Sequence, residues 1–166
     1  SYHISVVSNV DSNQDGLNDI ILGLGDYSGS GLTANGKILS LDGHDGTVLS
    51  EIEGQVNDAN TGYYIRSIPD MNSDGVSEIF CLNGMFTNST NVQAISVTSP
   101  MTSVWSNQVD FENGARNEDQ MAVVPLGDSN GDGIPELCVI ADRFAFDWMN
   151  YGYYFVGHAL FLLDGS

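Results

Sequence analysis

Short runs of apolar residues, separated by turns rich in Gly, Asn, Asp and Ser, recur along the whole chain. Runs of this length, rich in Val and Ile, are typical of β-strands. They fall into three successive groups that repeat the same order. The predicted strands span residues 3–7, 19–24, 37–41 and 47–52 in the first group, 63–68, 78–82, 92–97 and 102–105 in the second, and 121–126, 136–141 and 158–163 in the third. The pattern predicts an all-β chain of antiparallel four-stranded units, with no last strand in the third.

A nine-residue pattern, D-x-N-x-D-G-x-x-[D/E], lies between the first and second predicted strands of every group. Its copies begin at Asp11, Asp70 and Asp128, which lie 59 and then 58 residues apart. Self-similarity at a fixed period indicates a repeat architecture. The chain therefore divides into repeats of residues 1–56, 57–113 and 114–166, the last of them incomplete.

Each copy of the pattern predicts one calcium site. Oxygen-bearing side chains at positions one, three, five and nine, with glycine at six for a sharp turn, can surround a cation that takes about 6–8 oxygen ligands. The carbonyl of position seven would add a ligand. The predicted ligands are Asp11, Asn13, Asp15, Leu17 and Asp19 in the first loop, Asp70, Asn72, Asp74, Val76 and Glu78 in the second, and Asp128, Asn130, Asp132, Ile134 and Glu136 in the third.

Two other interpretations of the pattern are weaker. An EF-hand needs a glutamate at position twelve, where this chain has Leu22, Cys81 and Val139 inside predicted strands. Asp, Asn and Gly also form ordinary turns without any ion. Three copies in register, each placing three carboxylates in one turn, favour a cation because like charges this close repel each other. We therefore expect three Ca²⁺ ions.

The charge balance restricts the partners. The chain has 22 Asp and Glu against four Lys and Arg, a formal net charge of −18. Without a basic surface, binding to nucleic acid or to anionic membranes is not expected. No apolar run approaches the roughly 20 residues of a membrane-spanning helix. Weak calcium loops work where calcium is millimolar, so the pattern predicts an extracellular or cell-surface location.

The two cysteines fall at different offsets from their loops. Cys81 lies three residues and Cys138 two residues beyond the last predicted ligand. Because side chains alternate along a strand, the two thiols should point to opposite faces of equivalent strands. Buried free thiols are favoured over a disulfide between neighbouring repeats.

Repeats of about sixty residues with this loop between their first two strands resemble the FG-GAP family. These are the calcium-binding β-propeller repeats of integrin alpha subunits and of many secreted microbial proteins, including VCBS-type repeat proteins. Residues 36–49 also look like the hairpin of the third and fourth strands in FG-GAP and quinoprotein-type propellers. The resemblance implies propeller blades, each braced by Ca²⁺, with ligand contacts made elsewhere.

Blade number is where the chain departs from that family. Propellers typically close with about four to eight blades, and this sequence encodes fewer than three. An unclosed stack would expose apolar strand edges and faces. We expect either that the sequence is a piece of a longer chain with further blades, or that copies of it assemble.

The longer loops are expected on the face opposite the calcium loops, and residues 141–155 form the richest of them. This segment could dock a protein or a glycan, or it could cover an adjoining blade or subunit. Its candidate contact residues are Arg143, Phe144, Phe146, Trp148, Tyr151 and Tyr153.

The sequence carries no arrangement that favours catalysis. No nucleophile elbow is present, nothing places a Ser or Cys beside a base, and the clustered acids are assigned to cations. The sequence thus predicts a non-enzymatic, extracellular, calcium-stabilised β-propeller segment with an adhesion, binding or structural role. The alternative is a self-assembling structural subunit of an extracellular fibre or surface layer, with strand edges forming the contacts.

Overall fold

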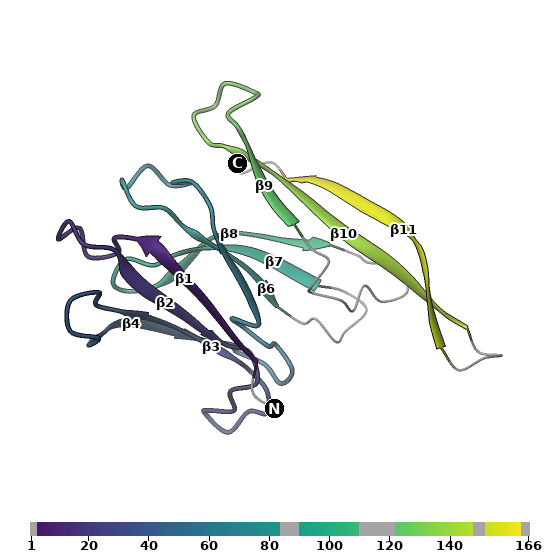
Figure 1. Cartoon of the computed structure of the whole chain (residues 1–166), viewed down its shortest axis with the longest axis horizontal. Coiled ribbons are helices and arrows are strands. Elements are labelled where there is room, and N and C mark those ends of the chain that lie inside the picture. Colours follow the sequence, from purple (N-terminus) through teal and green to yellow (C-terminus); the bar gives the residue numbers. More distant parts are fainter. Residues whose placement is uncertain (1–2, 84–89, 110–121, 148–151, 164–166) are drawn as a thin grey trace.

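The structure, a computed structural model, describes residues 3–83, 90–109, 122–147 and 152–163. All regular structure in these ranges is β-strand, arranged in three antiparallel sheets (Figure 1). The all-β, antiparallel prediction is confirmed. In the part of the chain described, no helix is long and apolar enough to cross a membrane.

The first sheet contains four strands in sequential order, β1 (Ile4–Val10), β2 (Asp19–Leu24), β3 (Lys37–Leu41) and β4 (Val48–Glu53). The bounds of β2 and β3 are those that the apolar runs predict. The three copies of the nine-residue pattern, residues 11–19, 70–78 and 128–136, are called acidic loops one, two and three. Acidic loop one joins β1 to β2. Here the antiparallel register shifts between Val7 and Val10, so a bulge precedes the loop.

The second sheet repeats this order with β5 (Tyr64–Ser67), β6 (Ile79–Asn83), β7 (Thr90–Ser96) and β8 (Thr102–Val109). Acidic loop two joins β5 to β6. Each strand pairs with the next one along the chain, so both sheets are meanders of the kind that the repeat predicts.

The third sheet contains β9 (Ala122–Gly127), β10 (Glu136–Asp147) and β11 (Gly152–Leu163), with β10 in the centre. Acidic loop three joins β9 to β10. The prediction of a long loop over residues 141–155 is wrong for most of that segment, because β10 and β11 continue through it as one long hairpin (Figure 1). Alternating aromatic residues favour strands. The register pairs Phe144 with Phe155 and Phe146 with Tyr153.

The first two sheets pack face to face through one apolar core. The first sheet contributes Val7, Val10, Ile21 and Ile38 to it. The second sheet contributes Ile65, Ile79, Cys81 and Ile95. All eight side chains are at least nine-tenths buried, so burial of apolar surface holds the sheets together.

A second core joins the second sheet to the third. Phe80 and Leu82 of β6 point into it, together with Leu137 and Val139 of β10. Strand β6 therefore supplies alternate residues to two different cores, which fits its continuous apolar sequence. The sheets form a stack of three, and none of them closes on itself.

Both cysteines are free and buried. Cys81 belongs to the core between the first two sheets. The neighbours of Cys138, Leu137 and Val139, face the second sheet, so Cys138 lies on the other face of β10. The predicted opposite orientation is confirmed, and the prediction of free thiols holds.

Both ends of the stack present apolar side chains to solvent. On the outer face of the first sheet, one row runs from Ile20 through Leu41 to Val48, and Ile20 and Val48 are 39% and 57% exposed. On the outer face of the third sheet, Leu162 of β11 pairs with Cys138 of β10 and is 63% exposed. Exposed apolar surface of this kind marks interaction sites in soluble proteins.

Candidate metal centre

The three acidic loops share one backbone conformation. The fourth and sixth residues of each loop have positive φ angles, which the other described residues of the loops do not. The values are 59°, 63° and 84° at Gln14, Ser73 and Gly131, and 90°, 86° and 90° at Gly16, Gly75 and Gly133. Glycine adopts this conformation without steric cost. The repeated pattern therefore gives three copies of one turn.

The same hydrogen bonds order the acidic side chains in each loop. The first carboxylate accepts from the N–H of position six, at 2.9, 2.8 and 2.8 Å. The amide of position three donates to the carboxylate of position five, at 3.1, 3.0 and 3.1 Å. The position-five carboxylate accepts from the N–H of position seven at 2.8 Å in every copy. These bonds hold the oxygens of positions one, three and five on the inside of the turn.

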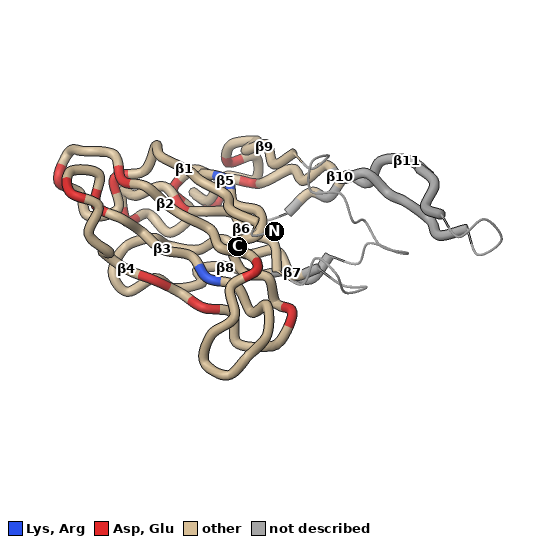
Figure 2. The backbone as a smooth tube through the Cα atoms, turned by 60° about the horizontal axis from the view of Figure 1, so that its bottom comes forward, with Lys and Arg blue, Asp and Glu red and all other residues tan. Residues whose placement is uncertain are grey.

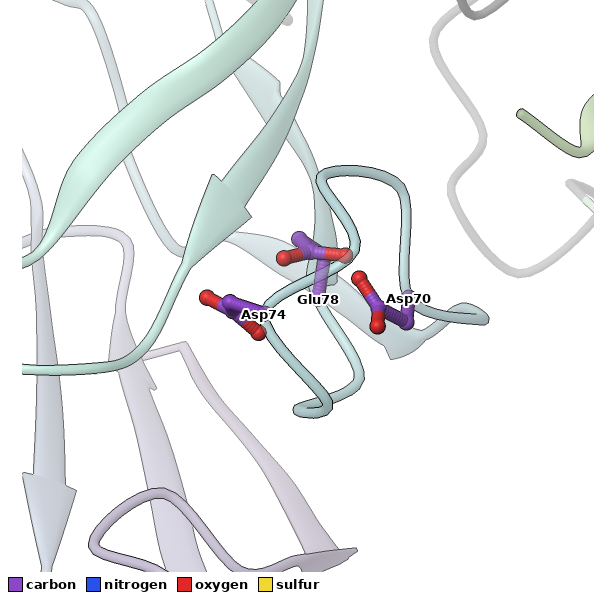
Figure 3. Close-up of side chains that lie close together, drawn as sticks. All are labelled: Asp70, Asp74 and Glu78. Atoms are coloured by element: carbon purple, nitrogen blue, oxygen red, sulfur yellow. The ribbon is translucent and has the colours of Figure 1, made fainter. Parts of the chain in front are cut away.

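In the second loop, oxygens of Asp70, Asp74 and Glu78 all lie within 4.8 Å of one another (Figure 3). Glu78 is completely buried. Its Oε2 accepts a hydrogen bond from the N–H of Met71, whereas Oε1 has no hydrogen-bond partner. Burial, followed by the nearby charges of Asp74 and Asp70, raises the pKa of Glu78 to about 7 against the opposing effect of the Met71 N–H. Such a group gains by contact with a cation.

The third loop repeats this arrangement. Oxygens of Asp128, Asp132 and Glu136 lie within 4.8 Å of one another. Glu136 is 3% exposed, and its Oε2 accepts from the N–H of Ser129 at 2.6 Å. Its Oε1 is buried and has no hydrogen-bond partner. Two acidic triads in the described residues can thus hold a metal ion.

The first loop differs at position nine. Asp19 is completely buried, but its Oδ2 accepts from both the N–H and the Oγ of Ser12, at 2.8 and 2.6 Å. Its Oδ1 accepts from the N–H of Gly43 at 2.9 Å. Burial alone would raise the pKa of Asp19, yet the bonds from Ser12 and Gly43 outweigh it and lower the pKa. Asp11, Asp15 and Asp19 form no compact triad.

The ligand set defines the class of ion. Every predicted side-chain ligand is a carboxylate or an amide, and the two compact triads contain neither His nor Cys. Oxygen ligands suit hard cations such as Ca²⁺, Mg²⁺ and Mn²⁺, whereas zinc and copper favour imidazole and thiolate. Acidic positions gather mainly on the loops at one end of the sheets (Figure 2). Negative charge concentrated in this way favours the approach of cations.

The candidate contact residues of the aromatic segment are described only in part. Arg143, Phe144 and Phe146 lie on β10, and Tyr153 lies on β11. Trp148 and Tyr151 lie outside the described residues. The structure therefore places four of the six on a hairpin instead of a loop.

The structure also contains a cavity that no sequence pattern predicts. A cavity of about 450 Å³ opens between the β4–β5 connection and the strands β6 to β8. Its polar wall carries the amides Gln55, Asn57, Asn83, Asn91 and Gln93 together with the carboxylates Glu53 and Asp58. The amides come from two separate stretches, the β4–β5 connection and the strands β6 and β7, and they follow no motif. Packing of the connection against the second sheet brings the two sets together.

Comparisons with known proteins give no assignment. The sequence matches no protein-family model, and no curated protein matches it significantly.

Proposed function

We propose that this chain is an extracellular, calcium-stabilised β-propeller segment that serves as an adhesion, binding or structural module. One observation carries the proposal. In the second and third loops, a buried glutamate oxygen without a protein partner lies beside two aspartates. A bound cation would supply the missing partner and neutralise the repulsion.

Calcium is the ion that suits these loops best. Ca²⁺ accepts six to eight oxygen ligands in irregular geometry, including backbone carbonyls, whereas Mg²⁺ demands a regular octahedron and retains several waters. A nine-residue turn that offers four side chains and one carbonyl fits the irregular coordination that Ca²⁺ accepts. The ordering of positions one, three and five by backbone N–H groups supports a site that is largely formed before the ion arrives.

The ion would stabilise each sheet through its second strand. Glu78 directly precedes Ile79 and Phe80, which enter the two different cores. Glu136 stands in the same place before Leu137. Fixing the ninth residue of the loop therefore fixes the start of a core strand. Calcium removal would leave three carboxylates in mutual repulsion at that point.

The expected ligand of the module is a protein or a glycan. The amide-lined cavity supports this because neutral amides can donate to and accept from hydroxyl and peptide groups. The net charge of −18 disfavours nucleic acid and anionic membranes. Catalysis is not proposed, since the clustered acids serve as cation ligands.

Thermal melting with and without calcium tests the proposal. At about 100 times Kd, each bound ion adds about 2.7 kcal/mol, and about 1 kcal/mol shifts the melting temperature of a chain this size by about 2–4 °C. Two or three ions together therefore predict a fall of roughly 10–30 °C after calcium is stripped. Millimolar Mg²⁺ should restore little of it. Glu78→Gln should reduce the calcium response, and an unchanged melt in the wild type would refute the proposal.

A second candidate function is a self-assembling subunit, favoured by the apolar outer faces of the first and third sheets. Further blades of a longer chain could cover the same faces. Sedimentation velocity over a concentration series distinguishes these cases. Self-assembly predicts oligomers that Leu162→Lys dissociates, while Val56→Lys, which changes an equally exposed residue in the β4–β5 connection, has no effect. A monomer at all concentrations would exclude self-assembly.

A further inference from the structure

The three loops share a backbone but use the ninth carboxylate in two ways, and we propose that the first loop is a weak calcium site that fills only after the second and third. In the absence of the ion, Asp19 serves as a structural clamp. This inference rests on the proposed calcium function and concerns the order and the strength of binding.

The clamp connects three parts of the first sheet. Asp19 at the start of β2 accepts from Ser12 within the loop and from Gly43 in the β3–β4 turn. The Oγ of Ser12 also bonds the Oγ of Ser40 on β3 at 2.7 Å. Ser12, Asp19 and Ser40 are all at least nine-tenths buried. The first loop is therefore held to its sheet by protein donors alone.

The second and third loops lack an equivalent clamp. In Glu78 and Glu136, one carboxylate oxygen accepts a hydrogen bond from the N–H of loop position two, and the other oxygen has no partner. In the second loop, position two is Met71, which has no hydroxyl, and the turn that corresponds to Asp42-Gly43 is Ser99-Pro100, where Pro100 has no N–H. In the second loop, these replacements account for the orphaned oxygen. The third loop keeps a serine, Ser129, at position two, but Glu136 accepts only from its N–H and Oε1 has no partner.

The difference in partners determines the difference in affinity. A buried polar atom without a partner costs free energy in the protein without calcium, and an ion that satisfies it recovers that cost on binding. In the first loop, the ion must share Asp19 with its donors or displace the N–H of Gly43. Binding there recovers no such penalty. Equal numbers of carboxylates therefore give unequal sites.

One feature acts in the opposite direction. Asn13 Nδ2 lies 3.4 Å from Oδ2 of Asp42, so the first loop has a fourth acid nearby. That additional charge attracts cations over a distance. Asp42 lies near the surface, where salt screens such attraction over about 8 Å at 0.15 M ionic strength. The order in which the three calcium sites fill should therefore be measured at about 0.15 M ionic strength, where salt screens the attraction of Asp42.

The unequal sites imply a graded response to calcium. As calcium falls, the first loop empties first, and its clamp keeps the first sheet folded. The second and third loops hold their ions to lower concentrations and lose stability when they empty. A change in calcium near the weak Kd thus alters the charge of the first loop without unfolding the stack.

Isothermal titration of the calcium-stripped 166-residue protein, with native mass spectrometry for stoichiometry, tests the inference. We expect two ions to bind tightly and a third to bind at least about tenfold more weakly. Three sites within about threefold of one another would overturn the inference and leave the proposed function intact. No binding up to about 10 mM calcium, about ten times the weakest Kd typical of extracellular calcium modules, would overturn both.

Three variants assign the sites. Asp11→Asn with Asp15→Asn should remove the weak site and leave both tight ones, whereas Glu78→Gln should remove a tight one. Asp19→Glu should give a third tight site, because the longer side chain can keep the Ser12 N–H and offer its second oxygen to the ion. Loss of a tight site from the double variant of Asp11 and Asp15 would contradict the assignment of the weak site to the first loop.

A measurement on the wild type avoids any dependence on variant folding. The clamp predicts that the Gly43 amide exchanges slowly with deuterium in the calcium-free protein, because Asp19 accepts it without the ion. Fast exchange of this amide without calcium, and protection only after calcium is added, would show that no clamp exists.

Discussion

The side-chain amide of Gln14 donates a hydrogen bond to the backbone carbonyl of Asp74 at 3.2 Å. The fourth residue of the first acidic loop thereby contacts the fifth residue of the second. A cavity of about 470 Å³ between the two loops is lined by residues of both, including Ser12 and Asp74. The acidic loops of neighbouring sheets therefore lie side by side, and the second loop can influence the first.

Removing this contact should weaken the protein slightly. Gln14→Asn keeps a residue that tolerates the left-handed conformation but shortens the side chain beyond reach of Asp74. A typical hydrogen bond contributes about 0.5–1.5 kcal/mol, so the melting temperature in calcium should fall by a few degrees. Ser73→Asn changes the equivalent position of the second loop, from which no contact to another loop is described. Equal losses in the two variants would show that the Gln14 contact contributes nothing.

The sequence predicts the sheets and the loops well because both depend on local chemistry. Turn residues at fixed offsets and apolar runs of strand length determine β2, β3 and the loop conformation without reference to distant residues. The nine-residue pattern also brings together Asp70, Asp74 and Glu78, whose separation is set by one turn. In these places, the residues that are close together in the structure are also close together in the sequence.

The remaining features depend on contacts between distant segments. The clamp on Asp19 requires Gly43, which is 24 residues away, and the orphaned oxygen of Glu78 is visible only when its neighbours are in place. The extension of β10 and β11 through the aromatic segment was not predicted. It depends on the pairing of these two strands with each other along their whole length.

The calcium-free protein should become more stable when the pH falls from about 8 toward 5. Burial gives Glu78 a pKa of about 7 in the folded chain, against an ordinary value of 4.5. The folded state therefore binds more protons than the unfolded state between these values, and stability decreases as the pH rises through this range. Melting temperatures of calcium-stripped protein across this range measure the effect.

The Glu78→Gln variant isolates this contribution from the general relief of negative charge on acidification. Its melting temperature should depend less on pH than that of the wild type. In saturating calcium the trend should reverse for the wild type, because protons compete with the ion for the carboxylates. A pH slope that is identical in the wild type and in Glu78→Gln would contradict the buried, unpaired state of this carboxyl.

Neither thiol should react in the folded protein, and Cys81 should be the last to react on unfolding of the stack. Complete burial raises the pKa of the Cys81 thiol to about 12, so almost no thiolate is present at neutral pH. Cys138 lies on the outer face of the third sheet. Timed labelling with a maleimide in increasing denaturant, followed by peptide mass spectrometry, measures the order. Labelling of Cys81 before Cys138 would contradict the placement of Cys81 between two packed sheets.

Two glycines with similar backbone conformations should respond very differently to a methyl group. Gly16 and Gly36 have φ angles of 90° and 73°, so alanine strains the backbone by about 1–2 kcal/mol at either position. Around Gly16 no atom lies within 4 Å of the added carbon, whereas at Gly36 that carbon would lie 2.2 Å from the backbone N and O of Thr61.

The clash at Gly36 cannot be relieved by a side-chain rotation, because Gly36 and Thr61 form a parallel β-bridge between the first sheet and the β4–β5 connection. Gly36→Ala must therefore separate these two segments and disturb the amide-lined cavity beside them. We expect Gly16→Ala to remain folded, with a loss of about 1–2 kcal/mol, and Gly36→Ala to lose considerably more in denaturant unfolding with saturating calcium. Similar losses in the two variants would mean that the two segments are not in contact, and that the cavity wall is set by other residues.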